Sequence, residues 1–489
     1  MNTLVPTCRR EYLSFFILLG VLALFYAVTF LPGHDWGDDF ALYIQHAHNL
    51  LSGIPYHDTH YLFNPEMPKI GPPAYPPGFP VLLLPVYSLF GLSWMAMKWW
   101  VTSFLLLALL TLYWMFAKQL TFASRLSLVA LVGFNGVFVQ VKEEIISDLP
   151  FLFFVLLTVG LLQRQSLSSA GKDLWVKAVL HALLIDVCYA IRLAGIVLVP
   201  ALLWRDWLQH RSITQSTRLT LFLFCLLAFM QHLVFSGGGG YLTSLFLDFR
   251  LAQLPVKLFH NLNYFTLIWG DDKWVRILLF LLSVPPVFLA LHRQWKKEVT
   301  IVETFCIGYF FLILLWPYTG VRFALPLFPF YFYYLLTTLQ ALPPIRFHNL
   351  VVSVSALFLG TAFFVYALHY QQRFQEGYWS VERDGVHHSY AQELFRFIGE
   401  ETAQDAVILF NKPRILALMT GRSASAFSAQ QPERLWEYIQ KVQAGYLIDA
   451  FLEGGPPTPG LQSFIANNPD RLQAVFARGP VVVYRILSP

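Results

Sequence analysis

Charged residues are scarce in this chain, and their scarcity excludes most kinds of soluble protein. Asp, Glu, Lys and Arg make up only 13% of the 489 residues, whereas 56% are hydrophobic and 17% are aromatic. A soluble domain of this length would need many more charges to cover its surface. The sequence therefore predicts a polytopic α-helical membrane protein.

Cysteine is also scarce, and the positive charges form no cluster in the sequence. The four cysteines have the spacing of neither a disulfide framework nor a metal site, so we expect no redox chemistry. The net charge of +5 comes from basic residues scattered through short loops. Such scatter indicates membrane topology rather than a surface that binds nucleic acid, so nucleic acid is not an expected partner.

The first apolar segment sets the expected orientation. Residues 12–31 are apolar and about long enough to cross a bilayer. Arg9 and Arg10 precede this segment, so the positive-inside tendency places the N-terminus in the cytoplasm. The segment lacks a small-residue cleavage site, and we therefore expect a retained anchor rather than a signal peptide.

Further apolar spans alternate with basic loops that we assign to the cytoplasm. The segment 178–204 has basic residues on both flanks, so we expect two short helices that turn near Arg192. Residues 79–91 would reverse the side of every later loop if they crossed the membrane, and we interpret them as an interfacial or re-entrant helix. The total is about eleven spans, an odd number, which places the C-terminus outside. The other expected spans are 97–117, 123–141, 149–164, 217–235, 274–291, 300–317, 323–341 and 348–369.

The composition changes near residue 371, where charge rises and short strand-like runs alternate with helical runs. This pattern predicts a small α/β domain on the outer face. We therefore expect a membrane domain, 1–370, whose first outer loop is 32–78, followed by an outer-face domain, 371–489. The strand-like runs are 406–410 and 481–486, and the helical runs are 390–400 and 431–442.

Two adjacent carboxylates follow the first span. Asp38 and Asp39 emerge at the outer membrane surface, at the start of an expected helix. One carboxylate would be enough to cap that helix. Two at a lipid–water boundary suit an enzyme that acts on a membrane-borne substrate. Helical spacing also places Asp39, Tyr43 and His46 on one face.

The rest of the first loop contains histidines and prolines. His57, Asp58 and His60 invite a metal site, but they lie in a proline-rich stretch without helical register, which favours solvated loop histidines. The run 71–78 resembles stiff polyproline chain that turns the loop back to the membrane. Tyr75, within this run, and Lys69, just before it, are candidates to contact a phosphate or a sugar.

A second polar group is expected on the outer face. Glu144 and Asp148 lie where the span 123–141 ends. Arg192 lies between two apolar half-spans, and an ionisable residue within a membrane segment is costly enough to suggest function. A guanidinium suits a lipid phosphate, although an ion pair with Asp186 is the structural alternative. Arg322, at the outer end of 323–341, fits phosphate contact and interface anchoring equally well.

Together these segments resemble membrane glycosyltransferases of the GT-C class. The resemblance is to the family 39-like branch that holds protein O-mannosyltransferases and bacterial aminoarabinose transferases, and it covers about residues 10–370. Two departures stand out: the family pair is usually Asp-Glu, and Lys69 is separated from Pro72 where aminoarabinose transferases have Glu-Lys-Pro-Pro. The matching segments are 37–43, 75–91, 147–151, 192–195 and 321–326.

The resemblance implies a function and a location. It implies a multi-pass enzyme of the bacterial inner membrane that transfers a hexose or pentose from a polyprenyl-phosphate donor to a lipid, glycan or protein acceptor outside, with inversion. Some relatives use a divalent metal and others do not. A transporter or flippase of a lipid-linked sugar and a non-catalytic scaffold are the alternatives. The implied site residues are Asp38, as the base that takes the acceptor proton, and Asp39 for catalysis, Arg192, Arg322 and Lys69 for the donor phosphate, and Tyr43, Tyr75, Glu144 and Asp148 for sugar or acceptor.

Overall fold

The computed structural model describes residues 5–67, 70–164, 172–235, 251–343, 345–347, 350–380, 384–452 and 460–487. They form two compact units that are described one at a time. The helical unit is built from Met1–Phe30, Lys98–Val234 and Asp248–Val381. The α/β unit is built mainly from Leu31–Met97 and Glu382–Pro489.

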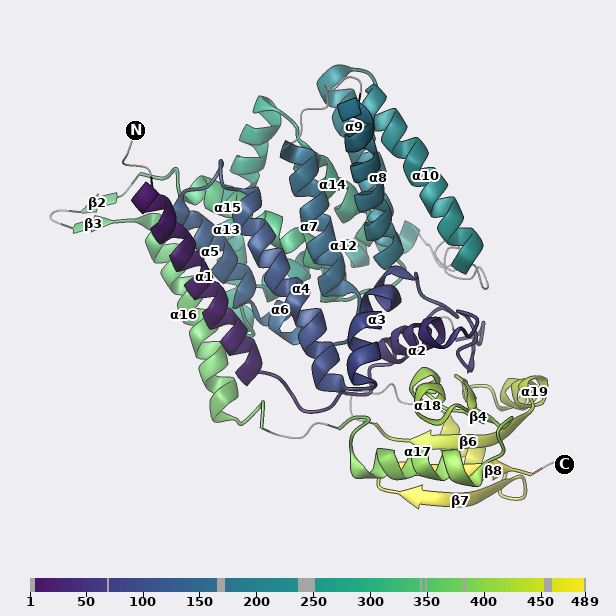
Figure 1. Ribbon diagram of the computed structural model, residues 1–489. Coiled ribbons are helices and arrows are strands. Elements are labelled where there is room, and N and C mark those ends of the chain that lie inside the picture. Colours follow the sequence, from purple (N-terminus) through teal and green to yellow (C-terminus); the bar gives the residue numbers. More distant parts are fainter. Residues whose placement is uncertain are drawn as a thin grey trace. The chain divides into compact units, whose positions relative to one another are not determined.

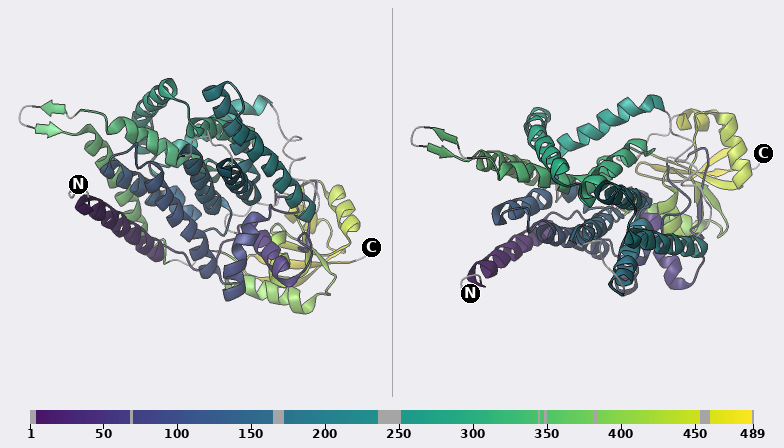
Figure 2. Two further views of the ribbon diagram at one scale, coloured as in Figure 1. Left: turned by 45° about the horizontal axis from the view of Figure 1, so that its top comes forward. Right: turned by 90° about the horizontal axis from the view of Figure 1, so that it is seen from above.

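Helices make up almost all of the helical unit (Figure 1). A β-hairpin, β2 (Ile345–Phe347) with β3 (Leu350–Val352), stands clear of the helices in Figures 1 and 2. The helices are α1 (Val5–Val28), α4 (Trp94–Met115), α5 (Phe122–Gly133), α6 (Gly136–Val141), α7 (Asp148–Arg164), α8 (Lys172–Ile191), α9 (Leu198–His210), α10 (Gln215–Phe235), α12 (Leu254–Leu267), α13 (Lys273–Lys297), α14 (Ile301–Leu315), α15 (Phe328–Leu339) and α16 (Val354–Gln375).

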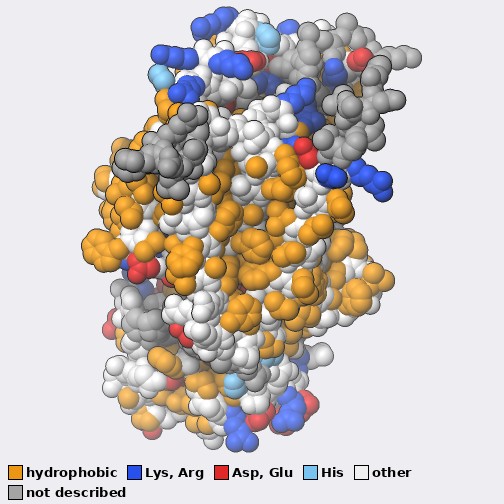
Figure 3. All heavy atoms as spheres, turned by 90° about the vertical axis from the view of Figure 1, so that its left-hand side faces the viewer, with side chains coloured by type: hydrophobic (Ala, Val, Ile, Leu, Met, Phe, Trp, Pro, Cys, Tyr) orange, Lys and Arg blue, Asp and Glu red, His pale blue; other side chains and the backbone are white. Residues whose placement is uncertain are grey.

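Long apolar helices confirm the class predicted from composition. In the described part of the chain, 6 helices are long and apolar enough to cross a membrane: α1, α4, α8, α10, α13 and α16. Figure 3 shows hydrophobic side chains covering the face that carries α1 and α16. Among the exposed side chains of these two helices are Phe16 and Leu24 of α1 and Leu357 and Phe364 of α16. Such a face is stable against lipid rather than water, so the chain is a multi-pass membrane protein.

The segment around Arg192 differs from the prediction of two short helices. The turn is where we expected it, but α8 has 20 residues and is long enough to cross a membrane. After Arg192 the chain forms a 3-10 helix, Leu193–Val197, and then α9. Gly195 permits this turn, because a Cβ there would lie 2.5 Å from the backbone of Cys188 and Tyr189. We underestimated the length of α8 because the basic residues at its start are typical of a loop.

Other expected spans are interrupted. The span 123–141 divides at Asn135, whose side chain caps α6 and donates to the Ile268 carbonyl at 2.8 Å. The span 323–341 begins as a 3-10 helix, Val321–Leu327, before α15. A further helix, α12, lies where we expected only loop. Buried polar partners of this kind satisfy backbone groups that a broken helix exposes, and sequence hydropathy does not reveal them.

The ends of the basic loops are tied to one another, as the predicted topology requires. Hydrogen bonds join the start of α1 to the start of α5, the end of α15 to the start of α5, the end of α7 to the end of α4, and α9 to the end of α7 and the end of α13. Their common side is consistent with our assignment, although its cytoplasmic location stays a prediction. The pairs are Arg125 with Glu11, Gln340 with Thr121, Gln209 with Glu298, Arg205 with Leu162 and Arg164 with Trp114.

The α/β unit contains a sheet with strand order β1-β5-β4-β6-β8-β7. Strands β1, β5, β4 and β6 pair in parallel with one another, whereas β8 pairs antiparallel with both β6 and β7. Leu409, Phe427, Leu447 and Phe464 contribute to a hydrophobic core against it. The strands are β1 (Tyr61–Leu62), β4 (Val407–Leu409), β5 (Ser423–Ser425), β6 (Ala444–Ala450), β7 (Leu472–Arg478) and β8 (Val481–Ile486).

Helices complete this unit and confirm the predicted α/β character of the C-terminal region. The predicted helical runs correspond to α17 (Ser389–Glu401) and α19 (Pro432–Val442). The shorter α18 (Pro413–Thr420) and α20 (Leu461–Ala466) were not predicted. The first loop contributes α2 (Asp39–Ser52), and α3 (Gly78–Phe90) follows directly after it. With 13 residues, α3 is about 20 Å long and shorter than a bilayer core, which suits an interfacial or re-entrant helix.

The first loop is an integral part of the C-terminal sheet. Its strand β1 pairs in parallel with β5, which follows it by more than 300 residues. Ser425 Oγ donates to the Leu62 carbonyl at 2.7 Å, and Asn64 Nδ2 donates to the Ala426 carbonyl at 2.9 Å. The compact unit therefore joins two stretches that we expected in different domains, and the boundary near 370 stays a prediction.

Candidate functional site

Asp38 is held by a residue from the C-terminal region. It occupies the N-cap position of α2, but its oxygens accept hydrogen bonds from α18. Arg414 Nε donates to Asp38 Oδ2 at 2.6 Å, and the Ile415 backbone N–H donates to Oδ1 at 3.1 Å. The Asp38 side chain is 9% exposed and that of Arg414 is 2% exposed. Capping of α2 therefore does not explain this aspartate.

Asp39 shares the same arginine and also binds a tyrosine. Its Oδ1 accepts from the Tyr75 hydroxyl at 2.8 Å and from Arg414 Nη2 at 3.2 Å. Arg414 Nη1 donates to that same hydroxyl at 2.9 Å. At 26% exposed, the Asp39 side chain is the more accessible of the two carboxylates. The structure therefore brings Asp38, Asp39 and Tyr75 together around one guanidinium.

The charges in this cluster stabilise one another. Burial alone would lower the pKa of Arg414, but Tyr75, Asp38 and Asp39 together raise it well above its ordinary value. The guanidinium is therefore permanently charged. Arg414 carries one positive charge, and Asp38 and Asp39 carry two negative charges, so the cluster has a formal net charge of −1. Such a cluster suits a partner that carries positive charge or gives up a proton.

Tyr75 is positioned by the face of α2 that the spacing predicts. Its ring stacks on Tyr43 with centroids 4.3 Å apart. Its backbone N–H donates to His46 Nε2 at 3.2 Å, while His46 Nδ1 lies 2.7 Å from the Tyr56 carbonyl. Burial lowers the pKa of His46 to about 4, so the ring is neutral and uses both nitrogens. Asp39, Tyr43 and His46 therefore all contact Tyr75.

The proline-rich run begins beside Arg414. Arg414 Nη2 donates to the Ile70 carbonyl, and the next residue, Gly71, has φ +127°. A Cβ at Gly71 would lie 2.6 Å from Arg414 Nη1. Only glycine allows the chain to pass so close to the guanidinium in this conformation. Lys69, which we predicted to contact the donor phosphate, lies outside the described residues.

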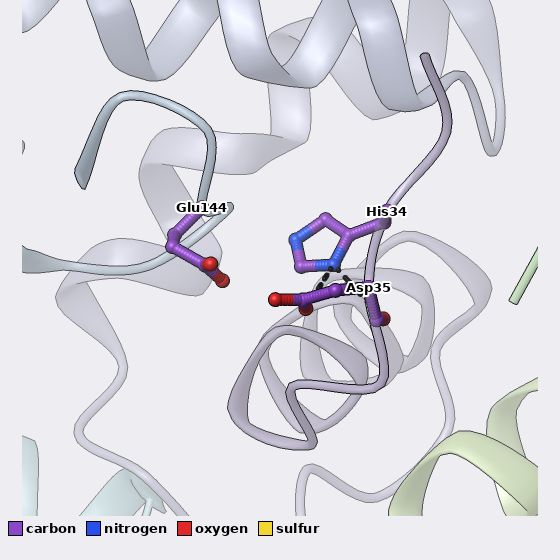
Figure 4. A group of neighbouring side chains, drawn as sticks. All are labelled: His34, Asp35 and Glu144. Atoms are coloured by element: carbon purple, nitrogen blue, oxygen red, sulfur yellow. Dashed lines mark hydrogen bonds and ion pairs between the residues drawn. The ribbon is translucent and has the colours of Figure 1, made fainter. Parts of the chain in front are cut away.

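The histidines of the first loop were candidate metal ligands. His57, Asp58 and His60 are exposed, and in the described part of the chain they do not converge on one ion site. Both nitrogens of His46 are already used. His34 Nδ1 lies 3.2 Å from Asp35 Oδ1, and Figure 4 shows the imidazole directly beside that carboxylate. In the α/β unit these two residues offer adjacent nitrogen and oxygen donors.

In the helical unit, Arg192 pairs with Asp148 and not with Asp186. Its Nη1 donates to Asp148 Oδ1, and the two side chains are 14% and 3% exposed. The guanidinium also lies 5.4 Å from the Phe323 ring centroid. Arg322 lies over the same ring, at 5.3 Å. The structure thus brings Asp148, Arg192 and Arg322 together at one end of the helices.

Glu143, which directly precedes the candidate Glu144, is paired with two lysines. Glu143 accepts from Lys98 Nζ at 3.0 Å and from Lys142. Lys142 is fully buried, donates to the Thr29 carbonyl at 2.8 Å and lies 4.0 Å from the Phe30 ring centroid. These contacts give Glu143 and Lys142 a structural role. Glu144 is only partly buried and stays a candidate for sugar or acceptor binding.

The sequence analysis missed Arg414. It lies in a soluble-looking segment where an arginine is unremarkable, and its partners precede it by more than 300 positions. Pro413 at the start of α18 is a helix-start signal that could have been used. That signal would place Arg414 in a first helical turn, but it would not reveal the acidic pair as its partner.

Of three comparisons with known proteins, the one with solved structures places the fold. No family model matches the chain, and no curated protein matches it. The structure of ArnT from Cupriavidus metallidurans bound to undecaprenyl phosphate is 13% identical, with a TM-score of 0.53 over 99% of this chain and 98% of that one. The Archaeoglobus fulgidus oligosaccharyltransferase tethered with an acceptor peptide is 11% identical, with a TM-score of 0.57 over 89% and 69%. The same archaeal enzyme in complex with Zn and sulfate is 12% identical, with a TM-score of 0.55 over 88% and 68%.

The chain is thus a polytopic membrane protein with a small C-terminal α/β region, as its composition predicts. Its fold is the GT-C fold of membrane glycosyltransferases, which both solved neighbours share. The resemblance drawn from the sequence motifs is confirmed at the level of the fold. At 11–13% identity the substrates of those enzymes are not transferred with it.

Proposed function

We propose that this chain transfers a sugar from a polyprenyl-phosphate donor to an acceptor at the outer face of a bacterial inner membrane, with inversion. The main support is the acidic pair, Asp38 and Asp39, held around Arg414 and Tyr75 in a chain with the GT-C fold. One solved neighbour binds undecaprenyl phosphate and another carries an acceptor peptide. A lipid-phosphate donor and an outside acceptor are the corresponding partners here.

The acidic pair would supply the general base. As the acceptor oxygen attacks the anomeric carbon, its proton passes to an aspartate carboxylate. The bond from that carbon to the phosphate oxygen breaks, and its electron pair leaves with the lipid phosphate. General-base catalysis of this kind contributes roughly 10²–10⁴-fold in rate. The second carboxylate stabilises positive charge on an oxocarbenium-like transition state. Tyr43 and Tyr75, already stacked on each other, offer a ring surface for the sugar.

The leaving phosphate needs positive charge. We propose Arg192, Arg322 and Lys69 as its ligands, with Glu144 and Asp148 as sugar or acceptor contacts. The guanidinium of Arg192 has five N–H donors, and Asp148 accepts from Nη1. Such an arginine is orientated in advance to stabilise charge that grows on the phosphate.

A divalent metal is a further candidate component. His34 and Asp35 are the fitting ligands in the α/β unit, although two donors are fewer than the three protein ligands of a typical catalytic site. A bound cation would supply additional stabilisation of phosphate charge. Treating membranes with EDTA and restoring activity with Mn²⁺ or Mg²⁺ tests this component. Activity that survives EDTA would assign the phosphate to the arginines alone.

The transfer itself is tested with membranes that contain the chain and a panel of radiolabelled polyprenyl-phosphate sugars. Asp38→Asn and Asp39→Asn keep side-chain size, so folding should survive. We expect at least one of them to lose at least about 100-fold in transfer rate, as the loss of a general base would cause. Full transfer by both well-expressed variants would contradict the proposal.

The alternatives give different outcomes in the same assay. A transporter or flippase would move the labelled lipid across vesicle membranes without changing it, and it would not need a base. A scaffold would do neither. We favour transfer because the two carboxylates lie in the α/β unit, outside the long apolar helices that would form a transport pathway.

A further inference from the structure

We propose that Arg414 is a positioning residue for the acidic pair: it anchors Asp38 and leaves Asp39 as the carboxylate that accepts the proton. This inference rests on the proposed function. It makes the C-terminal region part of the catalytic machinery rather than an appended domain. The argument depends on how the two aspartates share one guanidinium.

The two carboxylates are bound differently. Both Asp38 oxygens accept short hydrogen bonds, one from Arg414 Nε and one from the Ile415 backbone. The side chain is almost fully buried. Its burial restricts the approach of a substrate hydroxyl, and displacing either donor to make room would cost a buried charge-assisted hydrogen bond. Asp38 is therefore best suited to fixing α2 against the first turn of α18.

Asp39 keeps a geometry that suits proton transfer. It is about three times as exposed as Asp38, since the side chains are 26% and 9% exposed. Its hydrogen bonds to Tyr75 and to Arg414 Nη2 both end on Oδ1. These two bonds orientate the carboxylate. Preorganisation of this kind makes a general base effective, because the geometry is set before the substrate arrives.

Arg414 is itself tightly held, as a positioning residue must be. Its guanidinium donates to Asp38, Asp39, Tyr75 and the Ile70 carbonyl. Only a glycine at position 71 lets the first loop approach Arg414 so closely. With all three guanidinium nitrogens used, a lysine could reproduce the charge but not this set of contacts.

The test compares kcat and KM for a labelled polyprenyl-phosphate sugar in the full-length protein. We expect Arg414→Lys and Arg414→Gln to lower kcat at least tenfold while KM for the donor changes less than threefold. Arg422→Gln is the matched control. Arg422 is a similarly buried arginine of the same region, but it donates to the Gly399 and Thr402 carbonyls at 2.7 and 3.2 Å. A purely structural role for Arg414 would make both substitutions lower the amount of folded protein and leave kcat per folded molecule unchanged.

The double variant Asp38→Asn/Arg414→Gln separates the two aspartates. Arg414→Gln leaves the Asp38 carboxylate buried without its main partner, and Asp38→Asn removes that charge. We expect the double variant to recover at least threefold in kcat over Arg414→Gln alone, and Asp39→Asn to be inactive in every background. A double variant no more active than Arg414→Gln alone, or an active Asp39→Asn, would overturn the division of roles.

A second readout does not depend on transfer. Thermal unfolding in detergent is measured for Asp38→Asn, Arg414→Gln and their combination, with Asp38→Asn/Arg422→Gln as the matched pair. We expect the first combination to be clearly less destabilising than the sum of its single changes, and the second to be additive. Additivity in both would overturn the Arg414 anchor. An inactive wild-type protein with non-additive unfolding would instead refute the proposed transfer and retain the anchor.

Discussion

The backbone N–H of Tyr75 donates to Nε2 of His46 across 3.2 Å, and this bond requires the imidazole to be unprotonated at that nitrogen. Nδ1 of the same ring donates to the Tyr56 carbonyl at 2.7 Å. The neutral tautomer is therefore the one that the fold selects. Because Tyr75 in turn binds Asp39 and Arg414, the protonation state of His46 bears on the whole acidic cluster.

This relationship predicts acid sensitivity of the α/β unit. Burial lowers the pKa of His46 to about 4 in the folded state, from 6.5 in the unfolded chain. The unfolded state therefore binds the proton first, and stability is lost as the pH falls from about 6.5 to about 4. The loss is on the order of 3 kcal/mol for a fully expressed shift. Thermal unfolding of the wild type and of His46→Gln should differ in slope over this pH range. The exposed His57→Gln should follow the wild type, and a slope unchanged in His46→Gln would contradict the assignment.

A second prediction concerns Gly71, where φ is +127° and a Cβ would lie 2.6 Å from Arg414. Gly71→Ala should lower stability and also reduce transfer, because both the backbone conformation and the guanidinium must shift. Gly53→Ala is the control, since Gly53 has φ +68° but open space around it. That change should cost only the roughly 1–2 kcal/mol of a left-handed alanine. Equal effects of the two changes, measured by unfolding and by kcat, would show that the close approach to Arg414 is unimportant.

A third prediction separates structure from donor binding at Arg192. Arg192→Leu leaves Asp148 buried without its partner and should reduce folded protein, at a cost of about 3–5 kcal/mol. Arg192→Leu/Asp148→Leu should restore much of the folded amount. Arg192→Lys keeps the charge, so folding should persist while the donor concentration for half-maximal rate rises strongly. Unchanged donor dependence in Arg192→Lys, at matched protein amounts, would leave Arg322 as the arginine to test.

A fourth prediction concerns orientation. A reporter fused after Lys297, at the end of α13, should report the cytoplasm, because Lys296 and Lys297 lie in a basic loop. A reporter fused after Glu376, just beyond α16, should report the outer compartment. Three expected spans, 300–317, 323–341 and 348–369, lie between the two fusion points, so the two reporters should give opposite compartments. The same compartment for both would contradict the odd number of spans.

The sequence by itself determined the class of protein and much of its element order. Few charges and long apolar runs can be stable only in lipid, so the membrane class followed from composition. The period of apolar residues likewise predicted α17, α19, β4 and β8, because amphipathic periodicity is a local property. The spacing of Asp39, Tyr43 and His46 predicted a shared face for the same reason, and the structure directs all three to Tyr75.

Only the tertiary structure decided what these residues contact. Hydropathy carries no record of which distant segment supplies a partner, so Arg414 at Asp38 and β1 beside β5 were invisible in the sequence. The same holds for Asp148, which replaced Asp186 as the partner of Arg192. The break at Asn135 escaped prediction because this buried side chain acts through close contacts rather than through local propensity. Local pattern thus sets the class and the elements, whereas buried polar pairs between remote segments assemble the site.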